Sequence, residues 1–149
     1  MKLKDKINED LKLAIKDGDK LKLQTIRSIR ALIIEFEKNG SGKEFNEEEE
    51  IKLLSTAAKK RKDSIEQFRN AGREELAQKE ELELQILQSY LPKQLSIDEI
   101  KEVVKNLAAQ LDAKNKEDFP KLMPAAMKEL KGKADGKQVK EIVTNYLGN

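Results

Sequence analysis

Apolar residues recur at intervals of three and four positions along almost the whole chain, which is the period of an amphipathic α-helix. No segment alternates apolar and polar residues over a useful length, as a half-buried strand would. The spacing predicts seven helices, whose apolar stripes run through residues 3–15, 23–36, 51–68, 76–90, 100–111, 119–130 and 139–147. We therefore expect an all-α protein.

Residues that start or stop helices separate these stripes. The predicted N-caps are Asp19, Asn46, Ser96 and Asp135, and the predicted stops are Gly18, Asn39-Gly40-Ser41-Gly42 and Asn70-Ala71-Gly72. Asn46 with Glu49, and Ser96 with Glu99, have the spacing of a capping box. Pro124 lies within the sixth stripe, so that helix either begins later than the stripe or bends there.

The Leu91-Pro92 pair divides the chain, because the residue before a proline disfavours helical geometry. We expect an N-terminal bundle of about four helices over residues 1–91 and a small three-helix domain over residues 92–149. Ile51 to Phe68 forms a heptad-like seam that predicts packing against the following helix across a glycine turn. Arg61 falls on this seam, so its aliphatic stem is buried or it lies at the edge of the interface.

Composition narrows the chemistry that 149 residues can support. The chain has no Cys and no His, which excludes disulfides, Cys/His zinc sites and histidine-based catalytic triads. We find no nucleophile-and-base constellation and predict no catalytic residue, no metal site and no cofactor. Glu47 to Glu50 is explained by the positive end of a helix dipole. The uncharged runs are too short to span a membrane, and no secretory signal is evident, so we expect a soluble, cytoplasmic protein.

Charge is distributed unevenly between the two predicted domains. Residues 1–90 carry 19 basic and 19 acidic side chains, whereas residues 91–149 carry 11 Lys and 9 Asp or Glu. Five lysines cluster near the end of the chain, with two glycines that let a backbone approach another surface closely. The candidate RNA-binding residues are Lys128, Lys131, Gly132, Lys133, Gly136, Lys137 and Lys140. The same pattern also fits a glycine stop, an Asp135 cap and solubilising surface lysines.

A second basic stretch lies on the third predicted helix and just after it. Its members are Lys59, Lys60, Lys62, Arg69 and Arg73. This stretch is either a ridge that contacts phosphates or a solvated helix face paired with acidic neighbours.

Three blocks of sequence, in this order, resemble the YqeY family of small bacterial proteins. They are Lys59 to Ser64 with Ala71-Gly72-Arg73, then Tyr90-Leu91-Pro92-Lys93-Gln94-Leu95, then Lys131-Gly132-Lys133-Ala134-Asp135-Gly136. The resemblance covers essentially the whole chain, although Pro124 stands where the family usually has a small residue. It implies a C-terminal domain similar to the tail of GatB, the subunit of the tRNA-dependent glutamine amidotransferase whose tail reaches the tRNA elbow.

The resemblance therefore implies a tRNA-binding module linked to glutamine-dependent amide transfer, a carbon-nitrogen ligase activity. It implies tRNA and an amidotransferase or aminoacyl-tRNA-related protein as partners. The chain contains nothing like the catalytic core of GatB, so enzyme activity of its own stays open. The alternative is a protein–protein adaptor or accessory subunit with no RNA role. We expect the chain itself to be a monomer.

Overall fold

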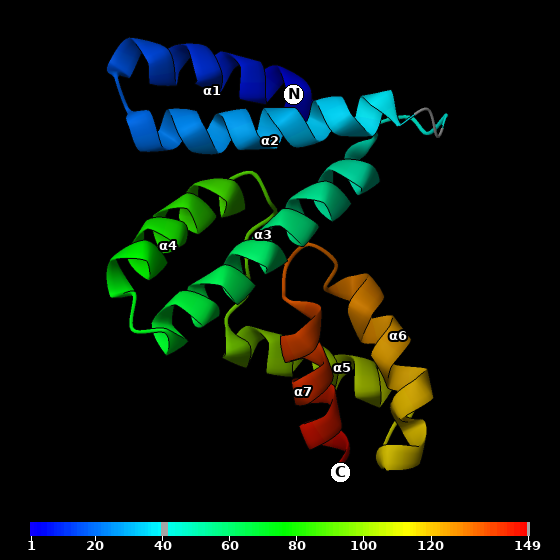
Figure 1. Ribbon diagram of the computed structural model, residues 1–149. Coiled ribbons are helices and arrows are strands. Elements are labelled where there is room, and N and C mark those ends of the chain that lie inside the picture. Colours follow the sequence, from blue (N-terminus) through cyan, green and yellow to red (C-terminus); the bar gives the residue numbers. More distant parts are fainter. Residues whose placement is uncertain (40–41, 149) are drawn as a thin grey trace. The chain divides into compact units, whose positions relative to one another are not determined.

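The computed structural model describes residues 1–39 and 42–148, and its helices follow the predicted stripes closely (Figure 1). The helices are α1 (Leu3–Asp17), α2 (Lys20–Lys38), α3 (Glu47–Asn70), α4 (Glu74–Gln88), α5 (Ile97–Leu111), α6 (Phe119–Glu129) and α7 (Gly136–Leu147), with a 3-10 turn at Lys116–Asp118. The described residues contain no strand. The all-α prediction is confirmed.

Cap residues explain where most helices begin. The side chains of Asp19, Asn46 and Asp135 each accept a hydrogen bond from a backbone amide in the following turn. Ser96 and Glu99 form a complete capping box, and the hydrogen bond from the Ser96 amide to the Glu99 carboxylate is the main reason that the pKa of Glu99 is lowered.

Two sequence predictions about helix ends need correction or extension. The expected box at Asn46 is only half formed, because the Asn46 amide donates to the Glu44 carbonyl instead of to Glu49. Pro124 lies inside α6, which runs unbroken to Glu129, so the helix neither starts after this proline nor ends at it. The predicted stop at Gly40 and Ser41 falls outside the described residues.

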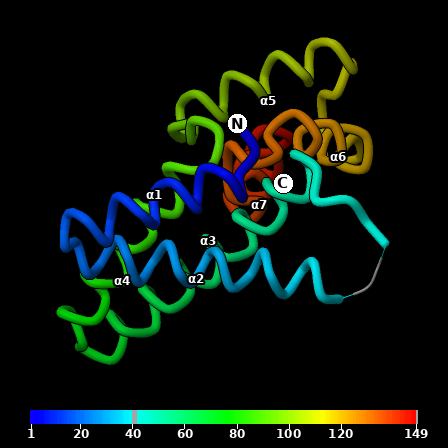
Figure 2. Tube along the Cα trace, turned by 90° about the horizontal axis from the view of Figure 1, so that it is seen from above, coloured from blue at the N-terminus to red at the C-terminus, as the bar shows by residue number. Residues whose placement is uncertain are grey.

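The chain divides into two compact units, Met1–Leu91 and Pro92–Asn149. In unit 1, α1 and α2 lie antiparallel, and α3 and α4 form a second antiparallel pair (Figures 1 and 2). The α3–α4 packing shows that the seam from Ile51 to Phe68 is intramolecular. The core of unit 1 comprises Leu3, Ile7, Ala14, Ile26, Ile29, Ile33, Leu54, Ala58 and Leu87.

Unit 2 is a three-helix cluster in which α5, α6 and α7 all pack against one another. Its buried side chains are aliphatic and come from every helix and from the α5–α6 connection: Ile100, Val104, Ala108, Ala113, Leu122, Ala126, Leu130, Val139, Ile142, Val143 and Leu147. With the apolar stripes turned inward, lysines remain on the outer faces of α5, α6 and α7.

Candidate functional site

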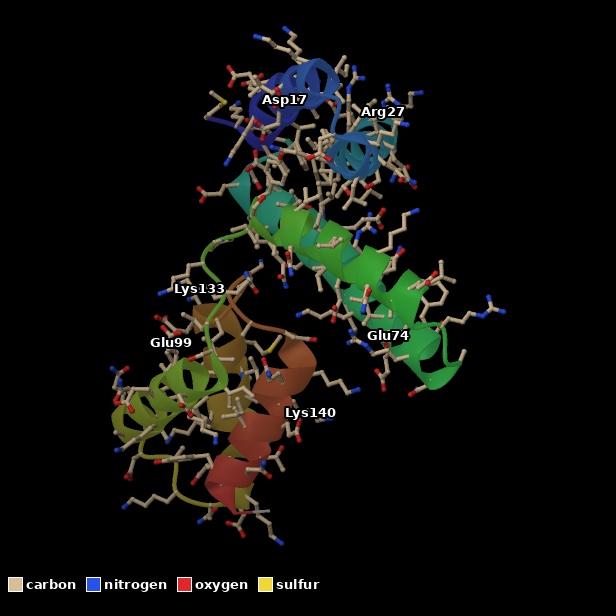
Figure 3. All side chains as sticks on the ribbon, turned by 90° about the vertical axis from the view of Figure 1, so that its left-hand side faces the viewer. Asp17, Arg27, Glu74, Glu99, Lys133 and Lys140 are labelled. Atoms are coloured by element: carbon tan, nitrogen blue, oxygen red, sulfur yellow. The ribbon has the colours of Figure 1, made fainter. Side chains whose placement is uncertain are left out.

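The five lysines predicted to contact RNA lie at the end of α6, in the connector that follows it, and on the first turns of α7. All five side chains are exposed. Lys137 and Lys140 are three positions apart on α7 and so share one helix face. Lys133, in the connector, projects from a different side of unit 2 than Lys140 (Figure 3). The structure therefore does not gather all five lysines on one side of unit 2.

Most of these lysines carry uncompensated charge. Among the described residues, no ion pair joins Lys128, Lys133, Lys137 or Lys140 to an acidic group. Long cationic side chains without an acidic partner keep their charge available for an external anion. The α6–α7 end of unit 2 is therefore a surface that can attract phosphate.

The two glycines of the candidate site have roles inside unit 2. Gly132 is buried with φ +76, and the turn that contains it is closed by a 2.9 Å hydrogen bond from the Lys133 amide to the Leu130 carbonyl. Positive φ at the third residue of a tight turn favours glycine. A Cβ at Gly136 would lie 3.1 Å from Cε of Met127, so glycine lets α7 begin close to α6. Neither glycine needs an RNA contact to explain it.

The Tyr90–Leu95 block and the Lys131–Gly136 block, which carry the family resemblance, meet through hydrogen bonds. The Gln94 side-chain amide donates to the carbonyl oxygens of Pro92 at 2.9 Å and Gly132 at 2.6 Å. The Leu95 amide donates to the Lys133 carbonyl at 2.9 Å. These bonds hold the lysine-bearing connector against the start of unit 2, and so limit where its lysines can point.

Tyr90, at the start of the first of these blocks, is anchored within unit 1. Its hydroxyl donates to Asp10 Oδ2 at 2.6 Å, and the Lys6 ammonium lies 5.3 Å from its ring centroid. Burial, together with the hydrogen bond to the Asp10 carboxylate, raises the pKa of Tyr90 above its ordinary value. This tyrosine is a structural anchor that ties the last residues of unit 1 to α1.

Sequence reasoning missed a second surface of unit 2, a shallow groove of about 370 Å³ between α5 and α7. Lys101, Glu102 and Lys105 line it from α5, and Tyr146 lines it from α7 with 46% of its surface exposed. An exposed aromatic ring beside two lysines can stack on an unpaired base while the lysines contact its phosphates. The i, i+4 spacing of the lysines is visible in the sequence, but their position beside Tyr146 is not.

Only part of the predicted basic ridge in unit 1 shares one helix face: Lys59, Lys62 and Arg69 lie on the same side of α3. Residues two positions apart on a helix point about 200° apart, so Lys60 faces away from Lys62. Arg69 is ion-paired with Glu81 at 2.7 Å and Glu74 at 3.4 Å, and the hydrogen bond to Glu81 is the main reason that its pKa is raised. Lys59 and Arg73 are exposed, and Arg73 is the N-cap residue of α4.

Arg61, which lies between these lysines, was expected on the helix seam, but its polar partners were not predicted from the sequence. Its guanidinium contacts Glu83 at 2.5 Å and Glu80 at 3.2 Å on α4, and donates to Ser28 on α2 at 3.2 Å. The sequence feature that corresponds to this network is the pair Glu80 and Glu83, three positions apart on α4. Recognising it requires the α3–α4 register.

The acidic run at the start of α3 is also engaged in structural contacts. Glu50 Oε1 accepts a hydrogen bond from the Leu3 amide at 3.1 Å, and Glu49 lies 4.0 Å from the Lys43 ammonium. Among the described residues, no group of three or more acidic side chains has the arrangement of a metal site. No described helix combines the length and hydrophobicity needed to cross a membrane.

Comparison with known proteins places the whole chain in one family. The family model described as Yqey-like protein matches residues 4–147. A relative from Pyrenophora tritici-repentis, "Altered inheritance of mitochondria protein 41, mitochondrial", is 33% identical over 96% of this chain and 80% of its own length. A protein of the same name from Lachancea thermotolerans is 36% identical over 73% of this chain and 59% of its own length.

These relatives correct two sequence predictions. They are eukaryotic proteins named as mitochondrial, so the expectations of a bacterial protein and of a cytoplasmic location are wrong. Neither the family description nor the relatives' names mention tRNA, a ligase or an amidotransferase, so the expected tRNA-binding and ligase activities find no support there. The match over residues 4–147 shows the family directly: the chain belongs to the YqeY family.

Proposed function

We propose that the protein is a non-catalytic RNA-binding module whose unit 2 contacts the phosphate backbone of structured RNA. The observation that carries this proposal is the exposed, unpaired state of Lys128, Lys133, Lys137 and Lys140 within 13 residues of sequence. Each phosphate that a lysine neutralises releases condensed counterions, which favours binding without any base contact.

The distribution of the lysines favours recognition of shape over recognition of sequence. Lys133 and Lys140 project from different sides of unit 2, and no aromatic residue lies among the clustered lysines in the sequence. Contacts of this kind position a protein on an RNA but do not read its bases. Tyr146, in the α5–α7 groove, is the residue best placed to add a base contact if the RNA presents an unpaired nucleotide.

Fluorescence anisotropy with a labelled tRNA transcript at several salt concentrations tests the proposal. The variant K137Q/K140Q removes two charges from one face of α7, and the matched control K12Q/K16Q removes two exposed charges from α1. We expect wild-type affinity to fall steeply with salt, and the slope of log K against log salt to become shallower by about 2 in the α7 variant only.

Two further nucleic acids test whether the surface prefers RNA over DNA. Mitochondrial RNA is the second ligand, because the relatives are named as mitochondrial proteins. Duplex DNA of equal length is the competitor. Absence of binding at micromolar protein, equal loss of affinity in both double variants, or equal affinity for duplex DNA would each contradict the proposed RNA-binding surface.

A further inference from the structure

Unit 1 contains an apolar groove that the RNA-binding surface does not use. The groove lies between α2 and α3, has a volume of about 550 Å³, and is open to solvent on one side. Its apolar lining comes from three helices and comprises Ile29, Leu32, Phe36, Leu53, Ala57 and Leu87. Apolar volume of this size on a small helical bundle is typical of a binding site.

The groove exists because α2 and α3 both pack on α4 and diverge from each other. At one end, Arg61 on α3 donates to Ser28 on α2. At the other end, the rings of Phe36 and Phe45 meet with their centroids 5.1 Å apart. Between these contacts the lining runs from Ser28 to Asn39 along the α2 side, a length of about 16 Å at 1.5 Å per residue.

The two rims of the groove differ in charge. The α3 rim presents Lys52, Thr56 and Lys60 at successive turns, and both lysines are exposed with no ion pair among the described residues. Glu49, one turn before Lys52, also lines the groove, but its carboxylate lies 4.0 Å from the ammonium of Lys43, which lines the groove too. The α2 rim contributes the uncharged side chains of Ser28 and Asn39. An occupant is therefore complementary when it is apolar toward the floor and acidic along the side that faces α3.

The backbone groups of the groove walls favour one conformation of a bound peptide. The groove walls are helices, whose amides and carbonyls are already bonded within each helix. An extended peptide would find no backbone partners there, whereas a helix satisfies its own backbone groups. A length of about 16 Å accommodates three helical turns.

We propose that the α2–α3 groove binds a three-turn amphipathic helix of a partner protein. Apolar residues at i, i+3 or i+4, and i+7 pack on the groove floor, and acidic residues on one flank face Lys52 and Lys60. The groove belongs to unit 1 and the proposed RNA-binding lysines belong to unit 2. The peptide-binding test and the RNA-binding test can therefore fail independently of each other.

The test uses two stapled helical peptides that share the same leucine positions and differ only on one flank, which carries either Glu or Lys. Fluorescence anisotropy with the 149-residue chain measures the affinity of each peptide. We expect the Glu peptide to bind more tightly, and K52E/K60E to weaken it by about tenfold and to favour the Lys peptide. The matched control K59E/K79E makes the same charge change at exposed positions that do not line the groove.

A third variant separates the groove from general electrostatic attraction. Thr56→Trp places a large side chain in the groove from an exposed position and should abolish binding of both peptides. Equal affinity of the wild type for both peptides, or equal weakening by the control variant, overturns the proposal. So does binding of an anionic amphiphile such as dodecanoate in place of the peptides, or a dimer of this chain that Thr56→Trp dissociates.

Discussion

Arg61 joins three helices of unit 1, and its replacement by methionine is the most informative test of how that unit is held together. Its partner Glu83 is a buried acidic residue whose side chain is only 7% exposed. In Arg61→Met, this carboxylate loses its cationic partner and lies near the like charge of Glu80. Breaking a buried ion pair from one side costs about 3 to 5 kcal/mol. We expect about 3 kcal/mol, because Glu80 is 24% exposed and water can reach the network from that side.

The double variant R61M/E83M separates burial of an unpaired charge from loss of the pair itself. Replacing both partners of a buried pair by apolar residues is often close to neutral. We therefore expect the double variant to be more stable than Arg61→Met by about 2 kcal/mol. Arg69→Met is the control, because its ion pairs are exposed and contribute little.

Native-state hydrogen exchange of the core amides of unit 1, such as those of Leu54 and Ala58, gives the free energy of opening for this unit. A loss of about 3 kcal/mol accelerates exchange roughly a hundredfold. Exchange in Arg61→Met at the wild-type rate would show that Glu83 does not depend on Arg61 for its burial. A double variant that exchanges as fast as the single variant would show that the unpaired Glu83 charge is not what destabilises Arg61→Met.

Three further substitutions test other parts of the fold. Tyr90→Phe should lower the free energy of unfolding by about 1 kcal/mol at neutral pH. Burial and Asp10 raise the folded-state pKa of Tyr90. Its contribution to the free energy of unfolding is therefore intact below pH ~10 and is lost as the pH rises further. Above that pH, urea titrations of the wild type and of Tyr90→Phe should give converging free energies of unfolding. Gln94→Leu should destabilise unit 2 by about 2 kcal/mol, since the buried Gly132 carbonyl loses its side-chain donor. Ser96→Ala should cost about 1 kcal/mol and increase amide exchange in the first turn of α5.

Helices and their ends could be predicted from the sequence because both depend on local chemistry. The caps at Asp19, Ser96 and Asp135 act within one turn, and the apolar stripes have a single period from end to end. The half-formed box at Asn46 shows that the spacing of two residues does not by itself decide which hydrogen bonds form at a helix start. The Asn46 amide has a local competitor in the Glu44 carbonyl, which the spacing rule does not consider.

The candidate sites were less predictable because they depend on which helices meet. Clustering of lysines in the sequence located the α6–α7 surface, but did not show that Gly132 would be buried under the Gln94 amide. The role of Arg61 and the position of Tyr146 beside Lys101 require the register of helices that are far apart in the chain. The α2–α3 groove is likewise a product of packing, since its two walls look like ordinary amphipathic helices.

An NMR titration of the 149-residue chain is the sharpest test of whether RNA binds at the lysine-bearing end of unit 2. Amide chemical shifts are followed as a tRNA transcript is added at low salt, and again at high salt. We expect shifts concentrated in residues 128–140, which diminish as salt rises. Shifts confined to unit 1, or none at saturating RNA, would contradict this expectation.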